Sequence, residues 1–518
     1  STDQYYNVVY SFTLDNFQAM LDPEYLKIYG QSILIAAIST AICLVLAYPF
    51  SYLISRTFKS KKTLLYMMII IPFWTNSLVR IYGWRTFLSA TGQLNTFLMT
   101  IGATSEPIQF LYNQACTVFG MAYDMFPFMV LPLYAAIEKL DESQIEASFD
   151  LGANMLATIF KVVIPQTMSG IFSGCIMVFM TCLADFGTPM LIGEGYNVMP
   201  VMIYSEFINE VGDQANFAAA MAALMVLITS TIFMLQKYVV NRKSFTMSSL
   251  RPLPVGELHG LRKVIVHLFI YTLVALSMIP QLVVIYTSFL KTSGSIFVDG
   301  YSLDSYRTIF DSLGTAISNT YLFSTTAMIA IIFLGMTIAY LTTRKKSWLT
   351  EIIDTLSMFP YIIPGSVLGI TLLLAFNDEP LLLSGTAAII IISLIIRRLP
   401  YTLRSSSAIL YQLSPSMEEA SISLGASPLK TFFKITAVMM LPGVMSGAII
   451  SWITAINELS SSIILFTGAT KTMSVAIYTE VIRASYGTAA ALSTILTLTT
   501  IMAMVIFFKV SGRRDVTL

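Results

Sequence analysis

Long apolar stretches recur from one end of the chain to the other, and they restrict the fold more than any other feature. A helix that crosses a bilayer needs about 20 mostly apolar residues. Charged residues make up only 11% of the 518 residues, whereas about a quarter of a soluble globular protein is charged. The sequence therefore predicts an all-α polytopic membrane protein with eleven visible spans, near residues 31–54, 63–90, 112–137, 163–186, 216–238, 264–289, 315–342, 352–376, 383–408, 436–465 and 487–509.

Proline and glycine interrupt some of these stretches. Proline removes a backbone donor and breaks helical hydrogen bonding, which a membrane helix tolerates only where neighbouring groups satisfy the backbone. We therefore expect broken helices around Pro72, Pro360 and Pro364.

The remaining composition limits the chemistry. A net charge of +1 gives no reason to expect a nucleic-acid partner. The four cysteines lie inside apolar runs without C-x-x-C spacing, so we expect packed free thiols. The two histidines lack metal-ligand spacing, and the sequence has no P-loop, no H-E-x-x-H and no G-x-S-x-G with a histidine partner. No catalytic residue, metal site or cofactor is predicted within the chain.

Basic residues cluster in loops that can all face the cytoplasm together, as the positive-inside rule requires. They follow the first and seventh spans, fill the segment 241–263 and close the chain: Arg56, Lys59, Lys61, Lys62, Arg344, Lys345, Lys346, Lys237, Arg242, Lys243, Arg251, Arg262, Lys263, Lys509, Arg513 and Arg514.

One polar octet occurs twice. "EASFDLGA" at residues 146–153 returns 273 positions later as "EASISLGA" at 419–426, and Pro127 and Pro400 share this spacing. Both octets fall on the predicted cytoplasmic side. "MIYSEFI" (202–208) likewise matches "AIYTEVI" (476–482), and "SFTLDNF" (11–17) matches "GYSLDSY" (300–306).

The repeated segments run in the same direction, so the chain is predicted to hold two parallel pseudo-symmetric repeats. The predicted halves are 1–240 and 264–518, joined by a cytoplasmic linker at 241–263. The second half has a helix near 264–289 before "GYSLDSY", whereas ten residues precede "SFTLDNF". We therefore expect a twelfth, N-terminal helix with a cytoplasmic leader to be missing from this sequence.

Each octet is expected to form a short helix that lies across the cytoplasmic face. Gly152 and Gly425 stand where such a helix must end and turn, a position that suits glycine. An amphipathic segment then leads into the next span.

The octets carry a resemblance to a known family. The pattern E-A-x-x-x-x-G, followed thirteen residues later by proline, resembles the cytoplasmic loop of permease subunits of bacterial ABC importers of the type I kind. Glu146, Ala147, Gly152 and Pro165 fit it. Glu419, Ala420 and Gly425 also fit, but Val438 replaces the proline, and Pro442 appears four residues later. The helices after the octets are therefore expected to differ.

The resemblance implies a fused, two-half permease in the bacterial cytoplasmic (inner) membrane. In this family the loop is a coupling helix that docks on a separate ATPase subunit, which carries ATP and Mg²⁺. Two loops in one chain imply two ATPase copies, and an external solute-binding protein, periplasmic or a lipoprotein, delivers the solute. The implied ATPase-coupling residues are Glu146, Ala147, Gly152, Ala153, Glu419, Ala420, Gly425 and Ala426.

Different segments of the chain resemble permeases for two different solutes. "PFWTNSLVRIYGW" (72–84) and "LPLYAAIEKLD" (131–141) resemble spermidine/putrescine permeases, whereas "RRLPYTLRSSSAIL" (397–410) and "SWITAINELSSSIIL" (451–465) resemble ferric-iron permeases. Ferric iron is the expected solute, with a polyamine or an aminophosphonate as the alternative. A secondary transporter is a remote alternative, because parallel repeats with cytoplasmic octets do not favour it.

Charges within apolar stretches mark candidates for the translocation path, because a charge in hydrocarbon is costly. Asp124 is equivalent by repeat to Arg397, and Asp185 to Glu458. These residues either line a path that tolerates a cation or serve structure, with Asp124 and Arg397 as an interdomain ion pair.

Four further charged residues are placed near the outer surface. Glu206 and Glu480 are candidate contacts for the binding protein. Arg80 and Arg85 are expected to extend toward the membrane interface.

Overall fold

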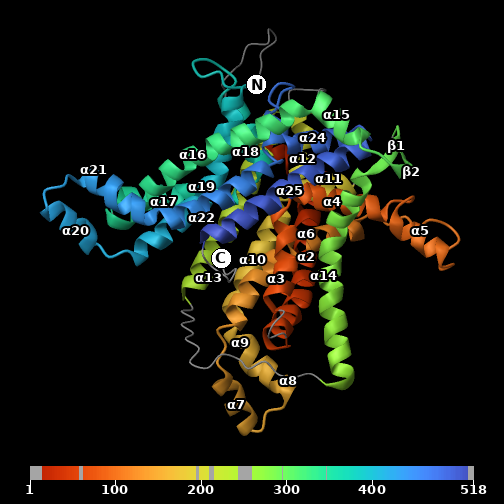
Figure 1. The fold of residues 1–518 in the computed structure, drawn as a ribbon, viewed down its shortest axis with the longest axis horizontal. Helices are drawn as coiled ribbons and strands as arrows, with labels where there is room; N and C mark the ends of the chain where they lie inside the picture. The colour runs from red at the N-terminus through yellow and green to blue at the C-terminus, as the bar shows by residue number, and fades with distance from the viewer. Residues whose placement is uncertain are drawn as a thin grey trace. The chain divides into compact units, whose positions relative to one another are not determined.

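A computed structural model describes residues 14–57, 62–193, 198–208, 215–242, 259–294, 296–345 and 347–511. Most of these residues lie in helices (Figure 1). Residues 11–13 of the first "SFTLDNF" segment and residues 243–258 of the predicted linker lie outside the described ranges.

Contacts divide the chain into two compact units. The first holds chiefly the residues up to Phe73 and Ser77–Val283, and the second holds Trp74–Asn76 and Val284–Arg514. This boundary lies inside helix α14 (Gly260–Ser288), so most of that helix packs with the first unit although it opens the second sequence repeat. Packing and sequence repetition therefore divide the chain at different places.

The first unit begins with a short helix and a long apolar one, and ends with another long apolar helix. Its elements include a π-helical turn at Ile159–Val163. Its α-helices are α1 (Asp15–Ala19), α2 (Pro23–Thr57), α3 (Lys62–Trp74), α4 (Ser77–Leu88), α5 (Gln93–Thr100), α6 (Gln114–Ile137), α7 (Glu142–Asp150), α8 (Met155–Thr158), α9 (Ile164–Gln166), α10 (Met168–Ala184), α11 (Gly187–Ile192), α12 (Met199–Ile208), α13 (Ala215–Arg242) and α14.

The second unit adds one short hairpin to a set of helices. Strands β1 (Leu290–Ser293) and β2 (Ile296–Tyr301) pair antiparallel and are the only strands among the described residues. A π-helical turn spans Phe432–Thr436. The α-helices are α15 (Asp304–Ser312), α16 (Gly314–Arg344), α17 (Trp348–Ile362), α18 (Gly365–Ala375), α19 (Ala387–Gln412), α20 (Ser416–Ser423), α21 (Pro428–Thr431), α22 (Ala437–Ile456), α23 (Ser462–Leu465), α24 (Met473–Ile482) and α25 (Tyr486–Ser511).

The two parallel repeats are visible in the order of these elements. Helices α6 and α19 begin 273 positions apart, as do α8 and α21 and the two π-helical turns. Figure 1 shows α7 and α8 together at one end of their unit, and α20 and α21 together at one end of theirs. The repeat predicted from the octets is thus a repeat of structure.

The helices after the octets differ, as the shifted prolines predict. Pro165 lies in the short helix α9, and the axis bends by 68° between the segment Met155–Gln166 and α10. In the second unit Pro442 lies within α22, and Pro428–Ile456 forms one apolar span.

Several of the eleven predicted spans are not single continuous apolar helices in the described ranges. In the described part of the chain six helices are long and apolar enough to cross a membrane, or seven if the bent pair counts as one span. The predicted spans 63–90 and 352–376 are each divided, between α3 and α4 and between α17 and α18. Pro72 and Pro364 lie at or near these breaks.

Two other predicted spans do not meet the length and hydropathy expected of a membrane-crossing helix, for different reasons. The span at 383–408 corresponds to α19, which begins at Ala387 and carries Arg397, Arg398 and Arg404. The span at 216–238 contains a shorter apolar helix, Asn216–Ile232.

Glycine allows α4 and α14 to approach within the first unit. A Cβ atom at Gly83 would lie 2.6 Å from the carbonyl oxygen of Pro280 and 2.7 Å from its Cβ atom. Neither atom can move without a shift of α14. Gly83 is therefore a fixed contact point for this helix.

We predict that Gly83→Ala lowers the free energy of unfolding by about 1–3 kcal/mol, because the added methyl overpacks the α4–α14 contact. The matched control is Gly30→Ala in α2, where a Cβ meets no atom within 4 Å. That control should be neutral or stabilising by up to about 1 kcal/mol. Thermal unfolding in detergent measures both, and equal melting temperatures would contradict the packing argument.

Candidate functional site

Two short helices, α7 and α20, end in the same way. The residue after each C-cap is a glycine with positive φ, +81° at Gly152 and +87° at Gly425. The Gly152 N–H donates to Phe149 O at 2.8 Å, and the Gly425 N–H donates to Ile422 O at 2.9 Å. No atom lies within 4 Å of a Cβ built at either glycine. The backbone conformation, rather than lack of space, therefore requires glycine here.

A buried pair of hydroxyls fixes each short helix to the segment that follows it. Ser148 Oγ lies 2.9 Å from Thr158 Oγ1, and Ser421 Oγ lies 2.9 Å from Thr431 Oγ1. Both members of the second pair stand 273 positions after those of the first. The turn between the short helix and the next span thus has a defined geometry in both units.

Apolar side chains point outward around each of these turns. Leu151 is 89% exposed and Leu424 is 90% exposed, and both stand directly before the turning glycine. Each has two further exposed apolar side chains nearby in sequence, again at equivalent positions: Leu156 and Phe160, and Leu429 and Phe433.

The predicted coupling residues are the polar and small residues of the octets and do not include these leucines. Among the eight predicted coupling residues, two are half-buried, Ala153 and Ala426, and the other six are exposed: Glu146, Ala147, Gly152, Glu419, Ala420 and Gly425. The signal for the leucines was present, since a leucine precedes the glycine in both octets.

A buried ion pair lies in the first unit. Arg80 Nε donates to Asp124 Oδ1 at 2.9 Å, and the side chains are 4% and 2% exposed. Arg80 Nη1 also donates to the carbonyl oxygens of Pro72 and Phe73, at 2.6 and 2.7 Å. The prediction that Arg80 extends to the membrane interface is wrong, because Asp124 and these carbonyls hold it inside the unit. Asp124, for which a pair with Arg397 was expected, has its arginine in its own unit.

Arg85, the other arginine expected at the membrane interface, is less buried. Its Nε donates to the Tyr112 hydroxyl at 3.4 Å, in an exposed contact.

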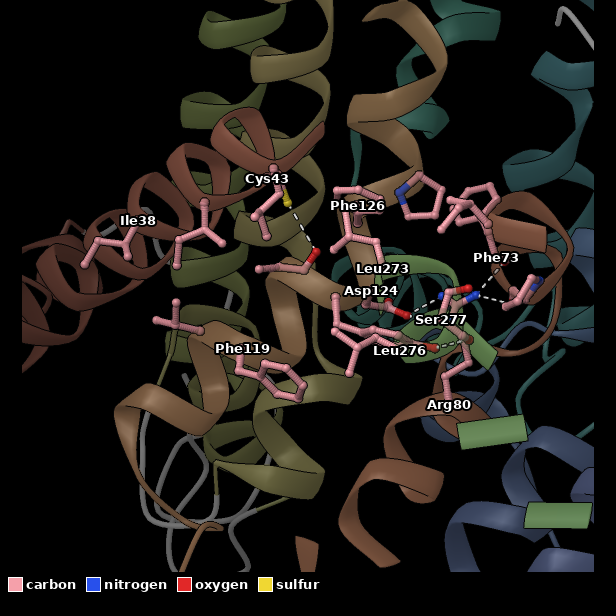
Figure 2. Close-up of a pocket in the computed structure, with 18 of the residues that line it drawn as sticks. Ile38, Cys43, Phe73, Arg80, Phe119, Asp124, Phe126, Leu273, Leu276 and Ser277 are labelled. Atoms are coloured by element: carbon pink, nitrogen blue, oxygen red, sulfur yellow. Dashed lines mark hydrogen bonds and ion pairs between the residues drawn. The ribbon is translucent and has the colours of Figure 1, made fainter. Parts of the chain in front are cut away.

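The Arg80–Asp124 pair borders a cavity of about 560 Å³ (Figure 2). Its walls come from α2, α3, α6 and α14 and are mostly carbon, with Cys43, Phe126 and Leu276 among them. Because the nearest carboxylate already holds a guanidinium, the cavity suits an apolar occupant better than a polar solute.

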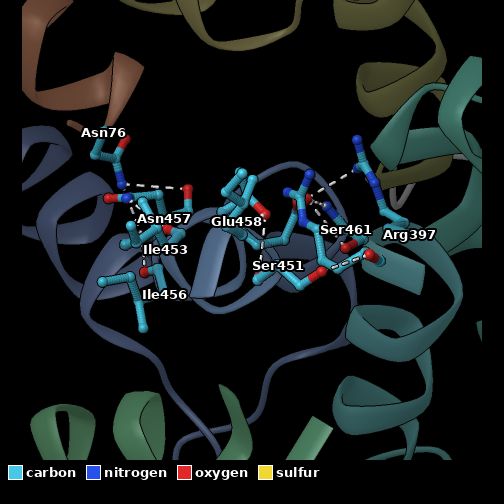
Figure 3. Close-up of polar contacts among 12 residues, drawn as sticks. Asn76, Arg397, Ser451, Ile453, Ile456, Asn457, Glu458 and Ser461 are labelled. Carbon is cyan, nitrogen blue, oxygen red and sulfur yellow. Dashed lines mark hydrogen bonds and ion pairs between the residues drawn. The ribbon is translucent and has the colours of Figure 1, made fainter. Parts of the chain in front are cut away.

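In the second unit, Glu458 occupies the break between α22 and α23. Arg397 Nη1 donates to its Oε1 atom at 2.9 Å, and Arg398 pairs with Oε2. The Ser461 N–H and hydroxyl both donate to Oε1 at 3.2 Å. Figure 3 shows Glu458, Ser461 and Arg397 in one group of polar contacts. Glu458 is 4% exposed, and both of its carboxylate oxygens have partners within the unit.

Glycine makes room for this cluster. A Cβ atom at Gly365, the first residue of α18, would clash with Arg397 Nη1. Nearby in Figure 3, Asn76 of the short segment Trp74–Asn76 donates to Asn457 O at 3.3 Å and to Ser474 Oγ at 2.8 Å.

Asp185, the repeat equivalent of Glu458, has a different environment. It follows α10, is half-buried, and accepts the Gly187 N–H at 3.1 Å through Oδ1. Its buried Oδ2 atom has no hydrogen-bond partner among the described residues. Two carboxylates at equivalent repeat positions thus have different partners. Glu458 pairs with two guanidinium groups, whereas Asp185 accepts a hydrogen bond from a backbone N–H.

The two carboxylates predicted to contact a binding protein also differ. Glu206 on α12 is half-buried, and burial, followed by the charge of Glu24, raises the pKa of its carboxyl. Glu480 on α24 is only 8% exposed and pairs with Arg483 at 3.5 Å, whose side chain is 67% exposed. Of this pair, Arg483 rather than Glu480 is the exposed side chain.

Metal-ligating side chains do not gather in the described ranges: no group of three or more His, Cys, Asp or Glu side chains is placed to hold a metal ion there. The four cysteines are free thiols, and three of them are buried.

Known proteins match both halves of the chain. The model of the family described as "Binding-protein-dependent transport system inner membrane component" matches residues 47–245 and 331–514. The match therefore includes both short helices and both turning glycines.

Curated relatives fall into two transport groups. The spermidine/putrescine transport system permease protein PotB of Escherichia coli (strain K12) is 43% identical over 188 residues, 36% of this chain and 68% of the relative. PotB of Haemophilus influenzae is 38% identical over 239 residues, 45% of this chain and 82% of the relative.

The second group matches more of this chain at lower identity. The ferric transport system permease protein FbpB of Actinobacillus pleuropneumoniae is 28% identical over 452 residues, 85% of this chain. The matched region spans 64% of that relative's own length.

We predict that Glu458→Gln destabilises the protein by about 3–5 kcal/mol, because it leaves the buried guanidinium groups without their carboxylate. The matched control is Asp354→Asn, whose pair with Arg404 spans 3.7 Å with side chains 35% and 58% exposed. That change should cost less than about 1 kcal/mol. Thermal unfolding in detergent compares them, and equal losses would show that Glu458 is not an anchor.

Proposed function

The chain belongs to the family of binding-protein-dependent transport system inner membrane components, and from this premise we propose that it is a fused, two-half permease subunit of an ATP-driven importer. It is a multi-pass inner-membrane protein with two copies of the permease domain in one polypeptide. The observation that carries the proposal is the pair of equivalent outward-pointing leucines, Leu151 and Leu424, at two glycine turns.

The leucines suit docking of a protein partner. A fully exposed leucine gains about 1.5–3 kcal/mol when it is buried. Leu151 and Leu424 stand on turns fixed by the Ser148–Thr158 and Ser421–Thr431 hydroxyl pairs, so little order is lost on binding. In our proposal each leucine enters a groove of an ATPase subunit, and Glu146 and Glu419 lie on the rim of the contact.

Two docking turns in one chain suit two ATPase subunits. In this scheme the ATPase subunits bind ATP and Mg²⁺ and hydrolyse ATP, so the permease itself performs no catalysis. Their closure displaces α7 and α20, and the two halves alternate access by rigid-body rocking.

On the opposite side, an external binding protein delivers the solute. Glu206 and Arg483, the exposed partner of Glu480, are the proposed contacts, since charged groups at an interface rim guide encounter.

Four ionisable residues remain the candidates for the translocation path: Asp124, Asp185, Arg397 and Glu458. Their environments refine the proposal. Asp124 and Glu458 already have arginine partners, whereas Asp185 has a buried oxygen without a hydrogen-bond partner among the described residues. Asp185 is therefore the best placed of the four to meet a cation, and the other three serve as structural anchors.

Ferric iron is the proposed solute, and a polyamine such as spermidine is the second candidate. The similarity to a ferric permease over 85% of this chain favours iron, and the higher identity to spermidine/putrescine permeases over 36% of it favours the alternative. An aminophosphonate is the remaining alternative. Uptake of radiolabelled iron and of spermidine into proteoliposomes, with the cognate ATPase subunit and binding protein, decides between them.

We predict that Leu151→Asp together with Leu424→Asp abolishes copurification of the ATPase subunit and reduces uptake at least about 100-fold, because two apolar contacts become buried charges. Each single variant should retain one docked subunit. The matched control is Leu303→Asp, a leucine that is 57% exposed before α15. Unchanged copurification in the double variant, with the control also unchanged, would contradict the docking proposal.

A further inference from the structure

An ion pair connects each short helix to the first long helix of its unit. Arg56 Nη2 lies 2.9 Å from Glu142 Oε2, and Arg344 Nε lies 3.2 Å from Glu418 Oε1. Both arginines are in the last turn of their helix, α2 or α16, and both glutamates are in the first turn of α7 or α20. The same connection is therefore made twice.

The two ion pairs have similar neighbouring residues, but their members do not follow the 273-residue spacing of the repeats. The segments "YLISR" (52–56) and "YLTTR" (340–344) place a tyrosine one turn before each arginine, 288 positions apart. The glutamates are 276 positions apart, although α7 and α20 follow the 273-residue spacing of the octets. The glutamate stands three residues later in the second copy, and the ion pair is nevertheless formed.

The tyrosines reinforce both pairs. Arg56 Nη1 donates to the Tyr52 hydroxyl at 2.9 Å, and the Tyr340 hydroxyl donates to Glu418 Oε2 at 3.3 Å. Arg344 Nη2 also donates to Leu413 O, at 2.8 Å, just before α20. Each pair is thus part of a small network that joins a helix end to a helix start.

The electrostatic setting favours these pairs over ordinary surface pairs. The four side chains are only 14–20% exposed. A cation at a helix C-terminus and an anion at a helix N-terminus both interact favourably with the helix dipole. The contacts are therefore stronger and less screened than exposed pairs such as Arg307–Asp304, whose side chains are 79% and 72% exposed.

Helix α2 makes further contacts with α7 and with the segment that follows it, over several helical turns. Tyr48 Oη lies 3.0 Å from Thr167 Oγ1, and Tyr52 packs against a small core that includes Ile145 of α7. Tyr48, Tyr52 and Arg56 are spaced four residues apart on α2. The ion pair is the last of these three contacts and the one nearest the start of α7.

We propose that the pairs Arg56–Glu142 and Arg344–Glu418 are coupling struts, which transmit displacement of α7 and α20 to α2 and α16. This inference rests on the proposed function, in which α7 and α20 dock the ATPase subunits. The four residues would act through α2 and α16, so they are positioning residues. Loss of either ion pair should lower the amount of solute transported per ATP hydrolysed, while α7 and α20 still bind the ATPase subunits.

The test uses the full complex in proteoliposomes, with Arg56→Glu, Glu142→Arg and the swap that combines them, and the same three changes at Arg344 and Glu418. Each single reversal should keep the ATPase subunit bound and basal hydrolysis intact, while solute transported per ATP falls at least about tenfold. The swap re-forms the ion pair but places both charges against the helix dipoles, so it should restore most, rather than all, of the lost ratio. Glu142→Gln, which removes charge but keeps shape, should give an intermediate loss.

The matched control is the exposed pair Arg307–Asp304, where Asp304→Arg should change nothing. A normal ratio of transport to hydrolysis in the single reversals would overturn the inference, as would a swap that melts like wild type but fails to restore the ratio. Those outcomes leave docking intact, so they do not touch the proposed function. A wild-type chain that binds no ATPase subunit would overturn both.

Discussion

A charge or a free backbone group inside hydrocarbon must find a partner within the protein, and this constraint organises the interior of both units. Where α3 breaks near Pro72, the carbonyl groups at the helix end accept hydrogen bonds from Arg80. Where α22 ends, the N–H of Ser461 donates to Glu458. The charged residues are thus the groups that satisfy the broken helix ends, and each is balanced by an opposite charge, Asp124 or the arginine pair.

The repeats share their geometry at the turns after α7 and α20 and differ in charge and hydrogen-bond partners within the apolar spans. The turning glycines, the hydroxyl pairs and the exposed leucines all recur at one spacing. Inside the apolar region the equivalent positions Asp124 and Arg397 carry opposite charges, and Asp185 and Glu458 have unlike partners. The two units are thus alike at the turns after their short helices and unlike in the polar chemistry of their interiors.

Much of the local structure around the two short-helix turns could be predicted from the sequence, because a repeated polar octet in an apolar chain specifies a local structure that repeats with it. Its leucines were overlooked because leucine is common throughout this chain, and only exposure distinguishes Leu151 and Leu424 from the others. Arg80 was misplaced because its partner lies 44 positions away, and a helix break, rather than any local pattern, brings the two together. Apolar length likewise does not show which spans are divided, since hydropathy averages across a proline break and does not show where the helix axis ends.

The central claim is that two equivalent turns each dock one ATPase subunit, and site-specific photocrosslinking tests it most directly. A photoreactive amino acid is placed at Leu151, at Leu424, or at the exposed Leu303 as a control, in the membrane complex with the ATPase subunit present. The account predicts a covalent adduct of the permease with one ATPase subunit from Leu151 and from Leu424, and none from Leu303. The absence of an adduct at both turns, in a complex that still transports solute, would contradict it.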